Sequence, residues 1–115
     1  MSGITTHVLD TARGRPAAGV PVTLEAKGEG GWAFVGRGAT DADGRLRDLA
    51  PSGFVLQEGA YRLTFDAGAY FAAAGAEGGG FYTEVVVSFV VRDAAAHYHV
   101  PLLLGPYGYT TYRGS

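Results

Sequence analysis

The sequence contains, at residues 97–104, its most regular stretch, His97-Tyr98-His99-Val100-Pro101-Leu102-Leu103-Leu104. Side chains of a β-strand point alternately to its two faces, so every second residue of this stretch faces the same way. One face, from Tyr98 to Leu104, is apolar, and the other face begins with both histidines. The alternation predicts a strand with one face in a hydrophobic core and the other available for chemistry.

The residues after this strand are expected to fold back along it. Gly105-Pro106 and Gly108 are typical turn residues. The alternation that follows, over residues 107–112, predicts a second strand that runs antiparallel to the first. This return brings Tyr112 and Arg113 towards the histidines. A chain that stops at Ser115 would place its terminal carboxylate in the same region.

Short alternating segments recur along the rest of the chain and predict further strands. They are Ile4–Leu9, Val20–Ala26, Trp32–Arg37, Gly59–Phe65 and Phe81–Val91. The alanine-rich segment Ala67–Ala74 predicts one helix of about two turns, with Asp66 as its N-cap and Gly75 at its end. The fold class is therefore all-β, an antiparallel β-sandwich of seven or eight short strands with one short helix.

The composition limits the possible functions. A chain of 115 residues fits one domain, residues 1–115, and it contains no cysteine, so neither disulfides nor thiolate chemistry are expected. The net charge of -2 argues against nucleic acid and membrane surfaces as partners. Met1-Ser2-Gly3 leads into the first strand without an apolar leader, which indicates a cytoplasmic protein.

Two further features carry candidate functional residues. Within the first strand, Thr5, His7 and Leu9 share the face opposite Ile4 and Val8, so a third histidine lies outside the core. The motif Asp41-Ala42-Asp43-Gly44 admits a calcium-loop interpretation, but the acidic ligands do not continue after Gly44, and we favour a tight turn with this glycine at positive φ. Such a turn would direct Arg45 outward at the start of the next strand.

The chain resembles the 5-hydroxyisourate hydrolase group of the transthyretin-like proteins. Four segments carry this resemblance: Thr6–Asp10, Thr40–Arg45, His97–Leu104 and the terminal Tyr112-Arg113-Gly114-Ser115. The terminal tetrapeptide is the most specific, because the hormone-binding transthyretins lack it. The resemblance implies a transthyretin-like sandwich that forms a homotetramer, with active sites where two subunit dimers meet, and a small-molecule substrate, 5-hydroxyisourate.

The resemblance also implies which residues form the site. The catalytic residues would be His7, Arg45 and His99. Substrate would be bound by His7, Arg45, Tyr112, Arg113, Gly114 and Ser115. The implied reaction opens a cyclic amide in urate degradation to 2-oxo-4-hydroxy-4-carboxy-5-ureidoimidazoline, and no metal or other cofactor is expected.

These residue types suit that chemistry. Histidine has a pKa of about 6.5, so it can take a proton from water and return it to the departing nitrogen near neutral pH. Arginine can stabilise the oxygen that becomes anionic. We interpret His7 and His99 as the pair that handles protons, but the sequence does not say which holds the water and which moves the proton. His97 is expected to have a supporting role.

Several alternatives remain open. Three histidines with a His-x-His spacing permit a zinc site, which we favour less because no acidic residue lies beside them. A transthyretin-type binding protein would use the same channel for an apolar ligand. A structural sandwich, similar to the regulatory domains attached to carboxypeptidases, explains Gly19–Val22 and Asp41–Gly44 but does not explain the last nineteen residues.

Overall fold

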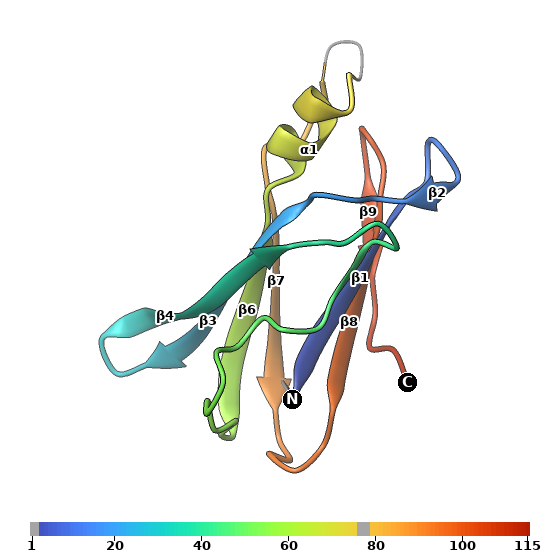
Figure 1. Cartoon of the computed structure of the whole chain (residues 1–115). Helices are drawn as coiled ribbons and strands as arrows, with labels where there is room; N and C mark the ends of the chain where they lie inside the picture. Colours follow the sequence, from blue (N-terminus) through green and yellow to red (C-terminus); the bar gives the residue numbers. More distant parts are fainter. Residues whose placement is uncertain (1–2, 76–78) are drawn as a thin grey trace.

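The computed structural model describes residues 3–75 and 79–115, so the expectation about a leader at Met1 and Ser2 lies outside the described residues. Two β-sheets face each other in a sandwich (Figure 1). The strands of the described ranges are β1 (Ile4–Asp10), β2 (Arg15–Pro16), β3 (Pro21–Gly28), β4 (Gly31–Ala39), β5 (Arg45–Leu46), β6 (Gly59–Phe65), β7 (Val85–Val91), β8 (Tyr98–Leu104) and β9 (Tyr109–Thr111). The predicted all-β sandwich is confirmed, although two of its nine described strands are only two residues long.

The first sheet has the order β2-β1-β8-β9, and β5 pairs with β1 beside this path. The second sheet has the order β4-β3-β6-β7. All described strand pairs are antiparallel except β1 and β8, which run parallel with Thr5 opposite His99 and His7 opposite Pro101. The parallel pair places the histidines of β1 and β8 on neighbouring strands, at the same end of the sheet.

The core lies between the sheets and follows the predicted alternation. On β8, Tyr98, Val100, Leu102 and Leu104 are buried, whereas His99 is half-buried on the outer face. On β1, the side chain of Val8 is fully buried, and that of His7 is half-buried. The outer face of the first sheet therefore carries both His7 and His99.

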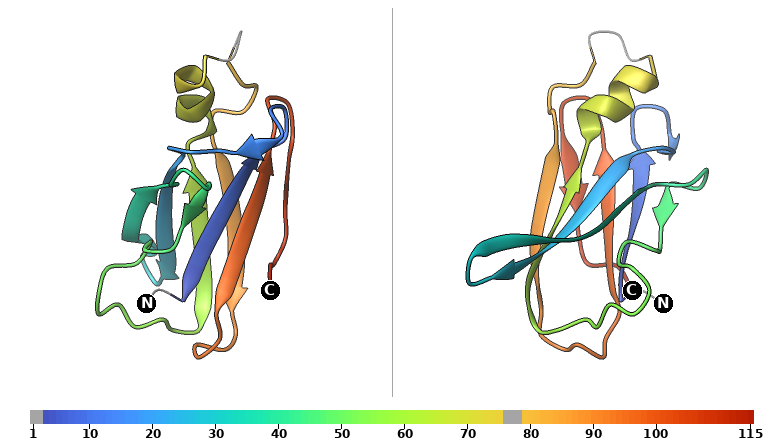
Figure 2. Two further views of the ribbon diagram at one scale, coloured as in Figure 1. Left: turned by 45° about the vertical axis from the view of Figure 1, so that its right-hand side comes forward. Right: turned by 60° about the vertical axis from the view of Figure 1, so that its left-hand side comes forward.

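The single helix of the described ranges, α1 (Ala67–Ala73), lies at the end of the sandwich away from the last residues of the chain (Figure 2). Asp66 is its N-cap, as predicted, and its side chain accepts a hydrogen bond from the backbone N–H of Ala69. Gly75 follows the helix at φ 72°. Tyr70 fastens the helix to β1, because its hydroxyl donates a 2.6 Å hydrogen bond to the buried carboxylate of Asp10.

Burial and the hydrogen bond to Asp10 together raise the pKa of Tyr70 to about 12. The phenol therefore stays protonated and keeps donating to Asp10 throughout the neutral range. No helix within the described ranges is long and apolar enough to cross a membrane.

Strand β7 forms one edge of the second sheet and differs from the prediction at its start. The sequence predicted a strand over Phe81–Val91, but the ladder begins only at Val85. Val85 and Val91 are buried in the core, and Val86 and Val90 are each 44% exposed on the other face. This edge therefore has apolar side chains on both faces.

Candidate active site

A cavity of about 480 Å³, lined by polar and charged residue types, opens on the outer face of the first sheet. Its lining comes from β1, β8, the segment that contains β5, and the end of the chain. The lining residues are Thr5, Thr6, Arg45, Arg47, Asp48, His97, His99 and Ser115. Residues from four separate parts of the sequence thus meet at one place.

His99 is held on two sides. Its Nδ1 lies 2.8 Å from the hydroxyl oxygen of Thr5, the residue opposite it on β1. On the other side, the Gly114 N–H donates a 2.8 Å hydrogen bond to the His99 carbonyl. A Cβ atom at Gly114 would lie 2.6 Å from Cδ2 of the His99 ring, so only glycine fits there without a shift. With Nδ1 and Cδ2 engaged, Nε2 is the nitrogen left to act on a ligand.

His7 lies beside the cavity, where its register partner Arg45 belongs to the lining. Its Nε2 is 2.9 Å from the backbone carbonyl oxygen of Asp43. A carbonyl oxygen can only accept a hydrogen bond, so Nε2 carries the hydrogen. The lone pair of neutral His7 is therefore on Nδ1, and the tautomer of this ring is fixed by the backbone.

The turn before β5 places Arg45. Gly44 has φ 76°, and the carboxylate of Asp41 accepts 2.9 Å hydrogen bonds from the backbone N–H groups of Asp43 and Arg45. The N–H of Arg45 is the largest cause that lowers the pKa of the Asp41 carboxyl. The predicted tight turn is confirmed, and the Asp41 side chain is occupied in holding it.

The charge around His99 favours its neutral form. Burial lowers the pKa of His99, and the positive charges of Arg45, His7 and His97 lower it further. A neutral imidazole at neutral pH is the form that can accept a proton from water.

The last four residues come after β9 and lie beside the start of β8, but they do not all reach the cavity. Ser115 is part of the lining, and Gly114 is bridged to His99. Arg113 places its guanidinium 4.5 Å from the centre of the Tyr98 ring and donates a 3.3 Å hydrogen bond to the His97 carbonyl. Tyr112 is 55% exposed and borders a separate apolar hollow of about 230 Å³. Within one chain, Arg113 and Gly114 thus fasten the tail, and Ser115 enters the cavity.

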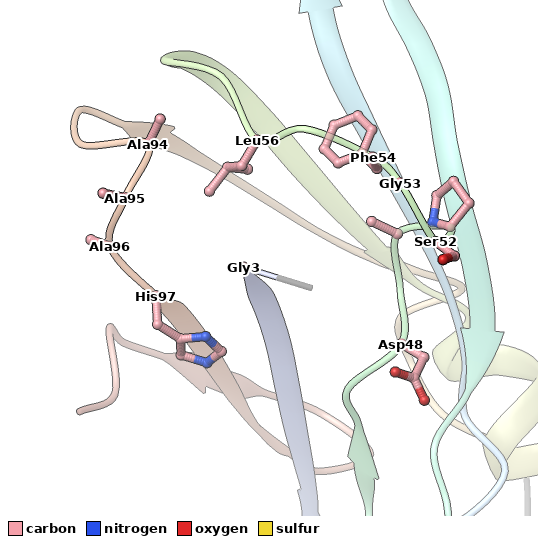
Figure 3. A pocket seen from close by; sticks show the side chains of 12 residues that line it. Gly3, Asp48, Ser52, Gly53, Phe54, Leu56, Ala94, Ala95, Ala96 and His97 are labelled. Atoms are coloured by element: carbon pink, nitrogen blue, oxygen red, sulfur yellow. The ribbon is translucent and has the colours of Figure 1, made fainter. Parts of the chain in front are cut away.

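A larger cavity of about 660 Å³ adjoins the first one and shares Asp48 and His97 with it (Figure 3). In this view the side chains of His97 and Asp48 lie on either side of Gly3. His97 is exposed, whereas His99 is half-buried. His97 therefore stands at the junction of the two cavities, which agrees with a supporting role.

Four lining residues were not predicted: Thr5, Thr6, Arg47 and Asp48. Thr5 shares the outer face of β1 with His7, and this period-two relation is the signal that could have identified it. Arg47 and Asp48 follow Arg45 directly in an irregular segment, where no periodicity indicates direction. Among the residues that the structure describes, no three His, Asp or Glu side chains are grouped so that they could hold a metal ion.

Comparison with known proteins gives consistent results. A sequence description of the HIUase/Transthyretin family matches residues 4–114. The chain is 47% identical, over 117 aligned positions, to a 5-hydroxyisourate hydrolase of Caulobacter vibrioides, and the match covers all of both chains.

Two solved structures are similar over almost the whole chain. The 5-hydroxyisourate hydrolase of Klebsiella pneumoniae has a TM-score of 0.82 and 39% identity, and the match covers all of both chains. A transthyretin from Sparus aurata has a TM-score of 0.88 and 31% identity, and the match covers 99% of this chain and 97% of that one. The fold is therefore common to a 5-hydroxyisourate hydrolase and a transthyretin, and the site residues must distinguish them.

Proposed function

The chain belongs to the HIUase/Transthyretin family, and from this membership and the cavity described above we infer that it is a hydrolase that opens 5-hydroxyisourate in urate degradation. The observation that carries this function is the meeting of His99, Arg45 and Ser115 in one cavity, in a chain that matches a hydrolase over its full length. The product is 2-oxo-4-hydroxy-4-carboxy-5-ureidoimidazoline.

The reaction needs one water molecule. Its oxygen bonds to a ring carbonyl carbon, one hydrogen passes to a base, and the carbonyl oxygen becomes anionic. The carbon–nitrogen bond then breaks, the nitrogen takes the proton from the base, and the carbon becomes a carboxyl group. A site for this step must hold the water, carry one proton for a short time and stabilise one oxyanion.

We propose that His7 and His99 divide the first two tasks. His7 offers the lone pair of Nδ1, since its Nε2 donates to the Asp43 carbonyl. His99 is kept neutral by burial and by the neighbouring positive charges, which lower its pKa. Both rings lie on the outer face of the sheet on neighbouring strands. One water molecule can donate a hydrogen to each ring, so its oxygen lone pair is left for the carbonyl carbon.

Arg45 supplies the charge for the third task in this proposal. It is half-buried, it lines the cavity, and its backbone is fixed by the Asp41 turn. A guanidinium group can donate two parallel hydrogen bonds to the developing oxyanion. Tyr112, Arg113 and Gly114 complete the site by positioning the tail that delivers Ser115.

The proposed assembly is a homotetramer. Val86 and Val90 on the edge strand β7 are exposed in the single chain, and Val87 and Phe89 border the hollow that Tyr112 also lines. An apolar edge of this kind is typical of a covered surface. Sedimentation is expected to give a tetramer, and a fully active monomer would contradict the assembly.

A transthyretin-type binding function is the second candidate, because the Sparus aurata transthyretin has the same fold. The lining of histidine, arginine and aspartate makes an apolar ligand less suitable here. A spectrophotometric assay with freshly generated 5-hydroxyisourate separates the two functions. The wild-type protein should accelerate its decay, and no acceleration beyond that of heat-denatured protein would reject the hydrolase.

A reaction without a metal remains our prediction. Dialysis of the protein against a strong chelator should leave its turnover unchanged. A loss of activity that zinc restores would instead support the zinc site. The single domain and the cytoplasmic location also remain predictions, which limited proteolysis and cell fractionation would test.

A further inference from the structure

One hydroxyl group lies between two of the three histidines. Oγ1 of Thr5 is 2.8 Å from Nδ1 of His99 and 2.9 Å from Nε2 of His97. Thr5 is only 8% exposed and stands directly opposite His99 in the parallel ladder. The mechanism given above does not use this residue.

The donor count of these groups restricts the arrangement. A hydroxyl group has one hydrogen and two lone pairs, and a neutral imidazole has one N–H. Thr5 can therefore donate to only one of the two rings, and the other ring must donate to Thr5. The direction of the hydrogen bonds that join His99, Thr5 and His97 decides which nitrogen of His99 carries the hydrogen.

We propose that Thr5 is a positioning residue for hydrolysis: it accepts a hydrogen bond from Nδ1–H of His99 and donates its own hydrogen to Nε2 of His97. Neutral His99 then keeps its lone pair on Nε2, the nitrogen left to act on a ligand. The opposite direction would put the hydrogen on Nε2 and leave no base there. The direction of these two hydrogen bonds rests on the proposed function, whereas the two contacts themselves do not.

The surroundings of His99 fit this role. Gly114 packs against Cδ2 of the ring, so Thr5 and the tail hold it from two sides. The charged and titratable groups that act on His99 are Arg45, His7 and His97, and all three can be positive. After Nε2 takes a proton, Nδ1–H still donates to Thr5, so the same contact serves both protonation states.

The first test reads the tautomer directly and needs no substrate. Two-bond ¹⁵N–¹H NMR spectra of the wild-type protein above the pKa of His99 should show this ring in the Nδ1–H form. A His99 ring in the Nε2–H form would overturn the proposal, whatever the activity of the protein. Loss of the proposed function would show separately, as absence of turnover in the wild-type protein.

The second test measures turnover. Thr5→Val keeps the shape of the side chain but removes the hydroxyl, and we expect kcat to fall about tenfold to a hundredfold with little change in KM. Thr5→Ser should restore most of this loss. The matched control is Thr11→Val, which removes a hydroxyl that donates a 3.3 Å hydrogen bond to Leu104 at the far end of the same strand pair. A Thr5→Val enzyme with wild-type kcat, or an equal loss in the Thr11→Val enzyme, would overturn the proposal.

Discussion

At the scale of single residues, a short turn links the two halves of the proposed chemistry. The Asp41 carboxylate holds the backbone of Asp43 and Arg45, and the Asp43 carbonyl accepts the hydrogen bond from His7. The same turn therefore fixes the tautomer of a histidine and the start of the strand that carries the arginine. Neither of its two aspartates is needed as a base.

Replacement of His7 or of His99 should greatly reduce turnover without unfolding the protein. We expect His7→Asn and His99→Asn each to lower kcat by about a hundredfold or more, the usual scale for a lost general acid or base. Asparagine has no basic nitrogen, so each substitution removes a proposed proton acceptor. Steady-state kinetics with circular dichroism as a folding check would measure both effects.

The control for this prediction is His97→Asn. His97 is exposed and reaches His99 only through Thr5 in the contacts described, so its replacement should cost much less. Equal losses at all three positions would mean that our assignment of the ring that faces the substrate is wrong.

The lowered pKa of His99 leads to a prediction about how the activity depends on pH. Burial lowers this pKa, and the positive charges of Arg45, His7 and His97 lower it further, so neutral His99 persists below the ordinary histidine value of about 6.5. The protonation of His99, read as its own step in the pH dependence, should therefore occur below that pH. Removal of a nearby positive charge stabilises the imidazolium, so Arg45→Gln should raise the pKa of His99. An NMR titration of the His99 ring would measure this pKa in both proteins, and a wild-type midpoint at or above the ordinary value would contradict the prediction.

At the scale of elements, the contact between β8 and the tail is sensitive to a single methyl group. A Cβ atom at Gly114 would meet the His99 ring at 2.6 Å and Pro101 at 3.3 Å. We expect Gly114→Ala to displace His99 or the tail and to reduce kcat/KM by about a hundredfold, the scale for misplacement of a reacting group by about 1 Å.

The matched control lies in the turn between β8 and β9. A Cβ atom at Gly108 meets no other atom within 4 Å, so Gly108→Ala should keep wild-type activity. The measurements are kcat/KM and melting temperature for both variants. A Gly114→Ala enzyme as active as the Gly108→Ala enzyme would show that the tail does not hold the His99 ring.

The elements differ in how far the sequence could predict them. The strand Gly59–Phe65 and the Asp66 cap were predicted at the right residues, because alternation and N-cap chemistry are local signals. The sequence could not predict that β1 runs parallel to β8, since period two gives the face of a strand but neither its partner nor its direction. For the same reason, His7 and Arg45 were nominated through the family resemblance, and Thr5 was missed.

At the scale of the whole molecule, the position of Ser115 makes the end of the tail sensitive to added bulk. Because Ser115 lines the cavity, a hexahistidine tag after it would occupy space that the substrate needs. We expect this tag, or deletion of residues 113–115, to abolish most of the activity with little change in melting temperature. Turnover assays and thermal unfolding of the two proteins would test this.

The control is the same hexahistidine segment inserted after Gly30. This residue is exposed at the tip of the β3–β4 hairpin, which projects from the sandwich (Figure 1). The inserted protein should turn over at the wild-type rate. If the enzyme tagged after Ser115 did so too, the tail would be an ordinary solvated end, and a main reason to prefer a hydrolase over a binding protein would be lost.

The parallel pairing of β1 with β8 also has a consequence for how the protein forms. Thr5 and His99 are 94 positions apart, so the contacts that build the site close a loop of nearly the whole chain. Non-local contacts of this kind form late, because their entropic cost is paid before the contacts stabilise the chain. On the ribosome, β1 emerges long before β8, whereas all four strands of the antiparallel sheet, β3, β4, β6 and β7, have emerged before β8 does. Partly folded chains should thus be inactive, and recovery of activity during refolding should follow the slowest structural step.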